Sequence, residues 1–129
     1  MRYRSVDVSE HACRRYGHEQ RDIAAWEPDR AADLVVCQGV LQYLDDKAAA
    51  SAIGHLASGT RSMLYLEVPT AGDRTGVLDL DASDLDVHWR TGAWYRRHLR
   101  GAGLAQVGAG LWAPTELTAA LYELERGPT

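Results

Sequence analysis

The sequence has 129 residues and a mass of 14.2 kDa, which fits one domain over residues 1–129. Hydrophobic residues make up 46% and charged residues 25%, so the composition excludes a disordered or collagen-like chain. The net charge of −4 gives no basic surface for nucleic acid, and no apolar run is long enough to span a bilayer. Two cysteines are too few for a disulfide framework, and the N-terminus lacks the apolar run of a signal peptide. We therefore expect a cytoplasmic protein with no nucleic-acid partner and no membrane partner.

The first thirty residues predict two short strands around a helix. The alternation over Tyr3–Val8 indicates a strand. Ser9 is a good N-cap for a helix that continues to about Tyr16, where Gly17 ends it. The segment Gln20–Ile23 indicates a second short strand.

Two buried strands and a helix are expected in the middle of the chain. The run Ala32–Cys37 is apolar after Asp33, as in a central parallel strand that is covered on both faces. Asp45 caps a helix to about Ala57, with Gly59 at its C-cap. Its apolar positions have helical spacing: Ala49, Ala52, Ile53 and Leu56. Ser62–Val68 is the second buried strand, and Pro69 ends it.

The last third of the chain predicts a helix and two closing strands. Thr91 caps a helix over Trp94–Arg100. Leu104–Val107 and Ala119–Glu125 are expected to form an antiparallel pair, with Pro114 in the connection between them. Strands that alternate with helices predict an α/β fold with three layers and a mainly parallel sheet.

An acidic stretch, Asp79–Asp86, raises the question of a calcium site. The pattern of an EF-hand requires glycine where Asp84 stands and glutamate where Arg90 stands, so we expect an exposed loop and no metal.

Five segments in this order are typical of one enzyme family. They are Ser5–Ser9, Gln20–Ile23, Asp33–Leu44, Leu64–Thr70 and Leu121–Glu125. They resemble the second, third, fourth, fifth and antiparallel last strands of the class I S-adenosylmethionine-dependent methyltransferases. The resemblance covers nearly all of the chain. It implies a Rossmann-like fold, S-adenosylmethionine as cofactor, and methyl transfer to a small-molecule substrate.

The first strand of that family and its glycine-rich turn have no counterpart in the sequence. None of the 12 glycines forms such a turn between a strand and a helix. The resemblance therefore implies an N-terminally truncated, incomplete domain whose activity alone is in doubt. The alternative is a non-catalytic methyltransferase-like remnant or interaction module.

The resemblance also places cofactor-binding residues at the strand ends. Asp7 would bind the ribose hydroxyls, Asp22 and Ile23 would flank the adenine, and Gln38 and Gly39 would lie beside the methionine part. The full set is Asp7, Val8, Asp22, Ile23, Gln38 and Gly39. A turn aspartate at Asp7 and a solvated loop acid at Asp22 are the alternatives.

Candidate catalytic and substrate residues follow the fifth strand and the acidic stretch. Glu67 ends the strand and is a candidate base or substrate anchor, and His88 is the best general-base candidate. Tyr43, Trp89 and Arg90 are candidates for the substrate wall. An ordinary surface histidine and a packing tryptophan are the competing interpretations.

The missing strand has a consequence for assembly. In the family it lies between the second and fourth strands, so its loss leaves Leu34–Cys37 with one unpaired side. Such an edge favours pairing with another strand. Three outcomes relieve it: the Tyr3–Val8 strand pairs there, a second copy or partner chain completes the sheet, or the N-terminal segment detaches. Self-association as a homodimer is the expected one.

Overall fold

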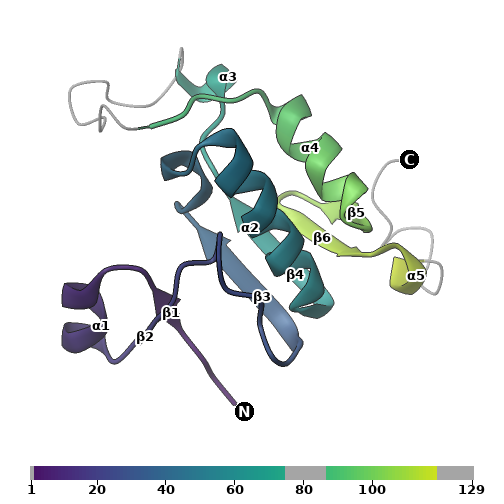
Figure 1. The fold of residues 1–129 in the computed structure, drawn as a ribbon. Helices are drawn as coiled ribbons and strands as arrows, with labels where there is room; N and C mark the ends of the chain where they lie inside the picture. Colours follow the sequence, from purple (N-terminus) through teal and green to yellow (C-terminus); the bar gives the residue numbers. More distant parts are fainter. Residues whose placement is uncertain (1, 75–86, 119–129) are drawn as a thin grey trace.

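A computed structural model of the chain describes residues 2–74 and 87–118. Its strands form two separate sheets, one of two strands with the order β1-β2 and one of four strands with the order β3-β4-β6-β5 (Figure 1). The N-terminal elements lie to one side of β3, at the edge of the larger sheet.

The smaller sheet and its helix come from the first twenty residues. Strand β1 (Val6–Asp7) and strand β2 (Glu19–Gln20) are parallel, and helix α1 (Glu10–Tyr16) connects them. The predicted caps are confirmed, because the Ser9 hydroxyl accepts the Ala12 N–H at 3.2 Å and Gly17 adopts a left-handed φ of 74°. Both strands are shorter than the sequence predicts.

The centre of the larger sheet is a β-α-β unit. Strands β3 (Ala32–Gln38) and β4 (Thr60–Glu67) are parallel, and helix α2 (Asp46–Ser58) crosses between them. Asp45 caps α2 through the Ala48 N–H at 2.8 Å, as predicted. The four apolar positions predicted for the buried face of α2 are all buried.

Position 59, at the end of α2, has no room for a side chain. The residue has an ordinary right-handed φ of −83°, so the left-handed cap that glycine often provides is absent. A Cβ at Gly59 would lie 3.0 Å from Pro28 Cγ, because the segment before β3 passes close to the end of α2.

The rest of the larger sheet is a hairpin. After α3 (Ala71–Arg74), helix α4 (Gly92–Gly101) begins at its predicted cap Thr91. Strands β5 (Leu104–Gly108) and β6 (Leu111–Pro114) are antiparallel, and a short helix α5 (Thr115–Thr118) follows.

The position of the antiparallel strand corrects the sequence prediction. Pro114 ends β6 and does not lie in a connection. Strand β6 pairs with both β4 and β5, so the antiparallel strand comes earlier in the chain than expected. The predicted strand at 119–125 and the acidic stretch at 79–86 lie outside the described residues.

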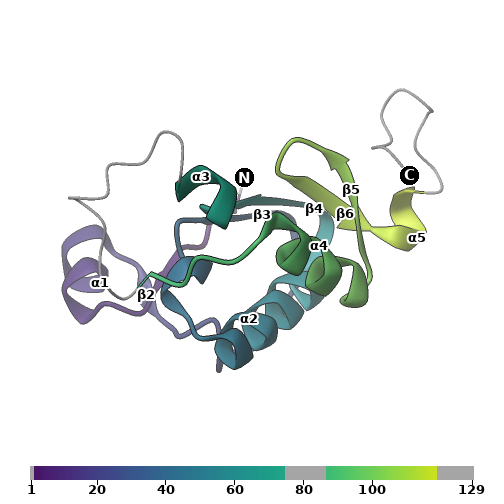
Figure 2. The same cartoon turned by 90° about the horizontal axis from the view of Figure 1, so that it is seen from above.

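Helices α2 and α4 cover the same face of the four-stranded sheet, and the core lies beneath them (Figure 2). Val35 and Cys37 of β3 point toward this core, whereas Leu34 and Val36 on the opposite face are 58% and 54% exposed. The expectation of a strand covered on both faces is therefore wrong for the described part of the chain. The same finding corrects the three-layer prediction for residues 2–74 and 87–118, because no second helical layer formed by these residues covers Leu34 and Val36.

β3 is also an edge strand. Its neighbour is β4, and β1 pairs only with β2. The loop between β2 and β3 is nevertheless attached to the larger sheet: His55 Nδ1 lies 2.6 Å from the Ile23 carbonyl oxygen, and Arg61 donates to the Ala31 carbonyl at 3.0 Å. Of the three outcomes expected for the open edge, direct pairing of the first strand with β3 is thus not adopted.

Among the described residues, no helix has the length and apolar character needed to cross a bilayer.

Two glycines with left-handed φ provide a matched test of the hairpin's approach to β4. A Cβ at Gly110 (φ 69°) would lie 3.1 Å from the Leu66 carbonyl oxygen and 3.0 Å from the Tyr65 ring, whereas one at Gly103 (φ 89°) would meet nothing within 4 Å. We expect Gly103→Ala to lower the free energy of unfolding by about 1 kcal/mol, from backbone strain alone. Gly110→Ala should lower it by about 2 kcal/mol or more, because a steric clash adds to the same strain. Urea denaturation measures both, and equal losses would contradict the close approach.

Candidate active site

The predicted cofactor residues lie where strands end. Asp7 is the last residue of β1, and the Ser9 N–H donates to its Oδ1 at 2.8 Å. Its Oδ2 accepts no hydrogen bond from the described residues and can accept one from a ligand. The turn function and a ligand function are therefore compatible in one carboxylate. Val8 follows directly and is 65% exposed.

Asp22 and Ile23 lie beside Asp7 because β1 and β2 are neighbours. The Arg21 N–H donates to the Asp7 carbonyl at 2.9 Å. Asp22 is exposed, and its Oδ1 accepts the Ala24 N–H at 3.0 Å. Ile23 packs against the main core.

Gln38 and Gly39 occupy the corresponding position at the end of β3. Gly39 turns the chain with a left-handed φ of 65°, and its N–H donates to the Glu67 carbonyl at 3.0 Å. Gln42 lies next to this turn, since its Nε2 is 3.6 Å from where a Cβ of Gly39 would be. Gln42 is only 7% exposed, and its Oε1 has no hydrogen-bond partner among the described residues. A buried acceptor without a donor is costly, so this atom is a candidate ligand contact that the sequence gave no reason to select.

Glu67 ends β4 and joins this group. Its Oε2 accepts hydrogen bonds from Tyr65 Oη at 3.0 Å and from Gln38 Nε2 at 3.2 Å. The bond and the charge of Glu67 raise the pKa of Tyr65, because both favour the protonated phenol. Gln38, Tyr65 and Glu67 thus form one exposed polar cluster at the carboxyl ends of β3 and β4.

Arg90 is buried, with 5% of its side chain exposed. It donates to Asp46 Oδ1 at 2.6 Å, to the Leu41 carbonyl at 3.1 Å, to Tyr95 Oη at 3.0 Å and to the Leu44 carbonyl. Its guanidinium also lies 4.7 Å from the centre of the Trp94 ring. The arginine therefore fastens the segment after β3 to α2 and α4, and its role in substrate binding stays a prediction.

The ion pair of Arg90 persists over most of the pH range. The hydrogen bond from Arg90 lowers the pKa of Asp46 below its ordinary value of 3.8. The ion pair therefore stabilises the fold fully at any pH above the ordinary pKa of 3.8. This stabilisation is lost only as the pH falls through the lowered pKa of Asp46.

The other predicted substrate residues lie around this anchor. Tyr43 is 49% exposed in the 3-10 helix Leu41–Tyr43. His88 is exposed, and its backbone N–H donates to the Gln42 carbonyl at 2.7 Å. Trp89 is half-buried. No group of three or more His, Cys, Asp or Glu side chains suited to a metal ion occurs in the described ranges.

The predicted site residues therefore fall into two groups. Asp7, Val8, Asp22 and Ile23 belong to the β1-β2 unit, whereas Gln38, Gly39, Glu67 and the substrate candidates belong to the β3-β4 side. Asp7, Gln38 and Glu67 are the last residues of β1, β3 and β4, whereas Asp22 and Ile23 lie in the turn after β2 and not in the strand predicted for them. The two groups lie on separate sheets, and no strand of the described residues lies between them.

Structural comparison identifies the fold. The chain is similar to a methyltransferase from Clostridium acetobutylicum that depends on S-adenosylmethionine, with a TM-score of 0.58, 12% identity, and coverage of 84% of this chain and 73% of that one. It is also similar to magnesium protoporphyrin IX methyltransferase from Synechocystis with bound S-adenosylmethionine (TM-score 0.55, 19% identity, 84% and 57% covered). An O-methyltransferase family protein from Burkholderia thailandensis gives a TM-score of 0.52 at 22% identity, with 79% and 37% covered.

These similarities show that the chain has the fold of the class I S-adenosylmethionine-dependent methyltransferases, as the order of its segments predicts. No protein-family model and no curated protein matches the sequence. The chain spans 57% of the Synechocystis enzyme's length and 37% of the Burkholderia protein's.

The anchoring role assigned to Arg90 is testable by mutation. We expect Arg90→Ala to lower the free energy of unfolding by about 3 kcal/mol, because Tyr95 Oη, two backbone carbonyls and Asp46 lose their shared donor. Arg97→Ala, at an exposed position of the same helix, is the matched control and should change stability by about 0.5 kcal/mol at most. Chemical denaturation measures both variants, and similar small effects would show that the buried network stabilises nothing.

Proposed function

We propose that the chain takes part in methyl transfer from S-adenosylmethionine to a small molecule once an additional strand and helix complete its sheet. The observation that carries this proposal is the gap between β1 and β3. A single strand placed there would convert two sheets into one with the order β2-β1-new-β3-β4-β6-β5.

The edges of β1 and β3 and the exposed face of β3 suit an added strand that is followed by a helix. Within the described residues, β1 and β3 each have one strand neighbour, so each has an edge that none of these residues pairs with. A helix following the added strand would cover Leu34 and Val36, which are more than half exposed on the face opposite α2. The solved methyltransferases with this fold contain additional chain, since this protein covers at most 73% of those compared above. The segment could precede Met1 in a longer polypeptide or belong to a partner chain.

The residues of this chain fit one end of the cofactor. Asp7 offers a free carboxylate oxygen at the end of β1 for the ribose, and Asp22 with Ile23 provides a carboxylate and an apolar side chain for the adenine. Gln38, Gly39 and the unpartnered Oε1 of Gln42 lie where the methionine part would reach β3. When bound, the cofactor supplies a methyl group already activated on a sulfonium centre.

The other end of the cofactor lacks its partners. A carboxylate of this kind is held by backbone N–H groups at a glycine-rich turn before a helix N-terminus. The described glycines with left-handed φ are Gly17, Gly39, Gly103 and Gly110. Gly39 follows β3 but precedes only the three-residue 3-10 helix Leu41–Tyr43, and the other three follow a helix or lie in the β5-β6 hairpin, so none of them belongs to a glycine-rich turn before an α-helix. The added segment would supply this turn.

Proton transfer is assigned to Glu67 and His88. Glu67 is oriented by Tyr65 and Gln38, so its carboxylate can accept a proton from a substrate hydroxyl or anchor a polar substrate group. His88 is exposed, and its backbone N–H donates to the Gln42 carbonyl next to Tyr43. This position supports its assignment as a base.

The cofactor assignment is tested by calorimetric titration with S-adenosylmethionine. Residues 1–129 alone should bind it weakly or not at all, and micromolar affinity would contradict the need for a completing segment. The same chain with a first strand, glycine-rich turn and helix from a related methyltransferase fused before Met1 should bind it. In that fusion Asp7→Ala should weaken binding by about 1.5–3 kcal/mol, because a charge-assisted hydrogen bond is lost.

Asp33→Ala is the matched control, because Asp33 is an exposed aspartate at the opposite end of β3 and pairs with Arg61. It should leave the affinity unchanged. A folded fusion without affinity for the cofactor would favour the alternative, a non-catalytic module with the methyltransferase fold.

The open edge should make the isolated chain self-associate. An uncovered strand with apolar side chains pairs readily with a second copy. Light scattering across protein concentrations should detect the dimer, and Val36→Lys should weaken it. Tyr16→Lys, at an exposed position of α1, is the control. A monomer at every concentration would contradict this prediction.

A further inference from the structure

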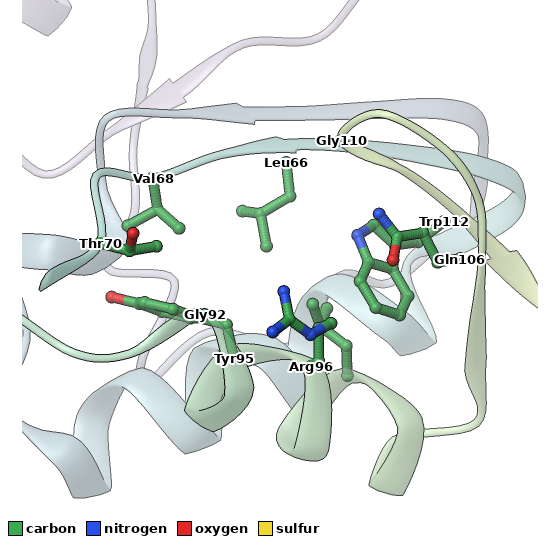
Figure 3. A pocket seen from close by; sticks show the side chains of 10 residues that line it. Leu66, Val68, Thr70, Gly92, Tyr95, Arg96, Gln106, Gly110 and Trp112 are labelled. Carbon is green, nitrogen blue, oxygen red and sulfur yellow. The ribbon is translucent and has the colours of Figure 1, made fainter. Parts of the chain in front are cut away.

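A pocket of about 220 Å³ lies apart from the strand-end site described above. It is formed where β4 ends, where α4 begins and where the β5-β6 hairpin turns (Figure 3). Leu66, Val68 and the rings of Tyr95 and Trp112 provide most of its apolar wall. Leu66 lies on the α4 side of β4, whereas the neighbouring Glu67 belongs to the exposed cluster of the other face.

Arg96 is an exposed residue of α4 whose side chain lines this pocket. Figure 3 shows its guanidinium pointing toward Leu66, with Trp112 and Gln106 on one side and Val68 and Thr70 on the other. It takes part in no hydrogen bond, ion pair or ring contact with the described residues. Arg90, six residues earlier, donates to four oxygens, so the two arginines differ sharply in what they bind.

Gly92 permits this position of Arg96. The two residues are four apart on α4, and a Cβ at Gly92 would lie only 3.0 Å from Arg96 Nη1. The first turn of the helix therefore leaves room for the guanidinium to fold back over the pocket. An alanine at this position would force the side chain to move.

The described lining of the pocket carries one charge, because it contains Arg96 and no acidic residue among residues 2–74 and 87–118. Asp73, three residues after the lining residue Thr70, accepts the N–H and the hydroxyl of Thr70 at 2.8 and 3.1 Å. Gln106 donates to the Gly108 carbonyl at 3.2 Å, and its amide oxygen accepts no hydrogen bond from the described residues. A guanidinium among apolar and aromatic walls is suited to a carboxylate on a flat apolar body.

We propose that this pocket binds a small aromatic carboxylic acid, with Arg96 as the partner of the carboxylate. The volume is below the roughly 300–1,000 Å³ of pockets for drug-sized ligands, so the acid is a compact one with a single ring. The acid would be the methyl acceptor only if the proposed function holds. Binding of the acid to the pocket does not depend on that function.

The test uses 4-hydroxybenzoate as the probe and 4-hydroxybenzamide as its neutral counterpart, each titrated calorimetrically into the full chain without cofactor. The wild-type chain should bind the acid about tenfold or more tightly than the amide. Arg96→Gln should remove that preference and weaken binding of the acid about tenfold, the scale of one charge-assisted hydrogen bond. Arg97→Gln changes an equally exposed neighbour that is not among the described lining residues, and it should change neither affinity. Gly92→Ala requires the guanidinium of Arg96 to shift by only a few tenths of an ångström, so it should weaken binding of the acid less than Arg96→Gln does.

Equal binding of acid and amide would overturn the proposal, as would absence of binding at millimolar acid or an unchanged affinity in Arg96→Gln. The outcome of this acid-binding test can be distinguished from the outcome of the cofactor-binding test. A chain that binds the acid through Arg96, but whose completed form does not bind S-adenosylmethionine, would support the pocket and contradict methyl transfer.

Discussion

The unpaired side of β3 is the constraint on which the interpretation of this molecule depends. A strand of this composition is stable when both its edges and both its faces are covered, because each buried amide needs a partner and each apolar side chain needs a neighbour. In this chain β4 covers one edge and α2 covers one face. No described residue pairs with the other edge, and Leu34 and Val36 on the other face are more than half exposed.

This constraint explains the separation of the candidate site into two groups. The residues expected to hold adenosine are on β1 and β2, and those expected near the methyl group are on β3 and β4. The loop between the two sheets is attached to α2 by His55 and to β4 by Arg61. The N-terminal unit is thus held beside the larger sheet without being part of it, and a strand between β1 and β3 would unite the two groups.

The core between the larger sheet and helices α2 and α4 is stabilised by apolar packing and by the hydrogen bonds of Arg90. Leu41, Ile53, Leu64, Leu99 and Leu104 are fully buried beneath α2 and α4. Arg90 then fixes the loop after β3 against both helices. The segment that turns away from the sheet at Gly39 therefore has a fixed geometry even though the edge beside it is open. A defined turn at the end of β3 is what a site at the strand ends requires.

Local patterns in the sequence correctly predicted the starts of three helices and the buried face of α2. The caps Ser9, Asp45 and Thr91 form the hydrogen bonds expected of them, and the spacing of Ala49 to Leu56 gave the buried face of α2. The connection predicted around Pro114 was wrong, because Pro114 is the last residue of β6 and a proline is tolerated at the end of a strand.

Features that depend on tertiary packing could not be predicted in this way. Apolar character gave no information on which faces of β3 are covered, because that depends on elements elsewhere in the sheet. Arg90 and Arg96 carry the same charge and lie on or next to the same helix. Only packing distinguishes the buried Arg90 from the exposed Arg96, which has no partner among the described residues. The isolated acceptor of Gln42 also had no signal in the sequence.

Hydrogen exchange of the β3 amides, measured by NMR at a low protein concentration, tests the open edge most directly. Because the Gly39 N–H bonds to β4 and bonding alternates along a strand with one neighbour, the amides of Val35 and Cys37 face β4. Those of Leu34, Val36 and Gln38 face the open edge. We expect slow exchange for the first group and fast exchange for the second. Uniformly slow exchange along β3 in the monomer would contradict the account, because it would mean that another part of this chain already covers the edge.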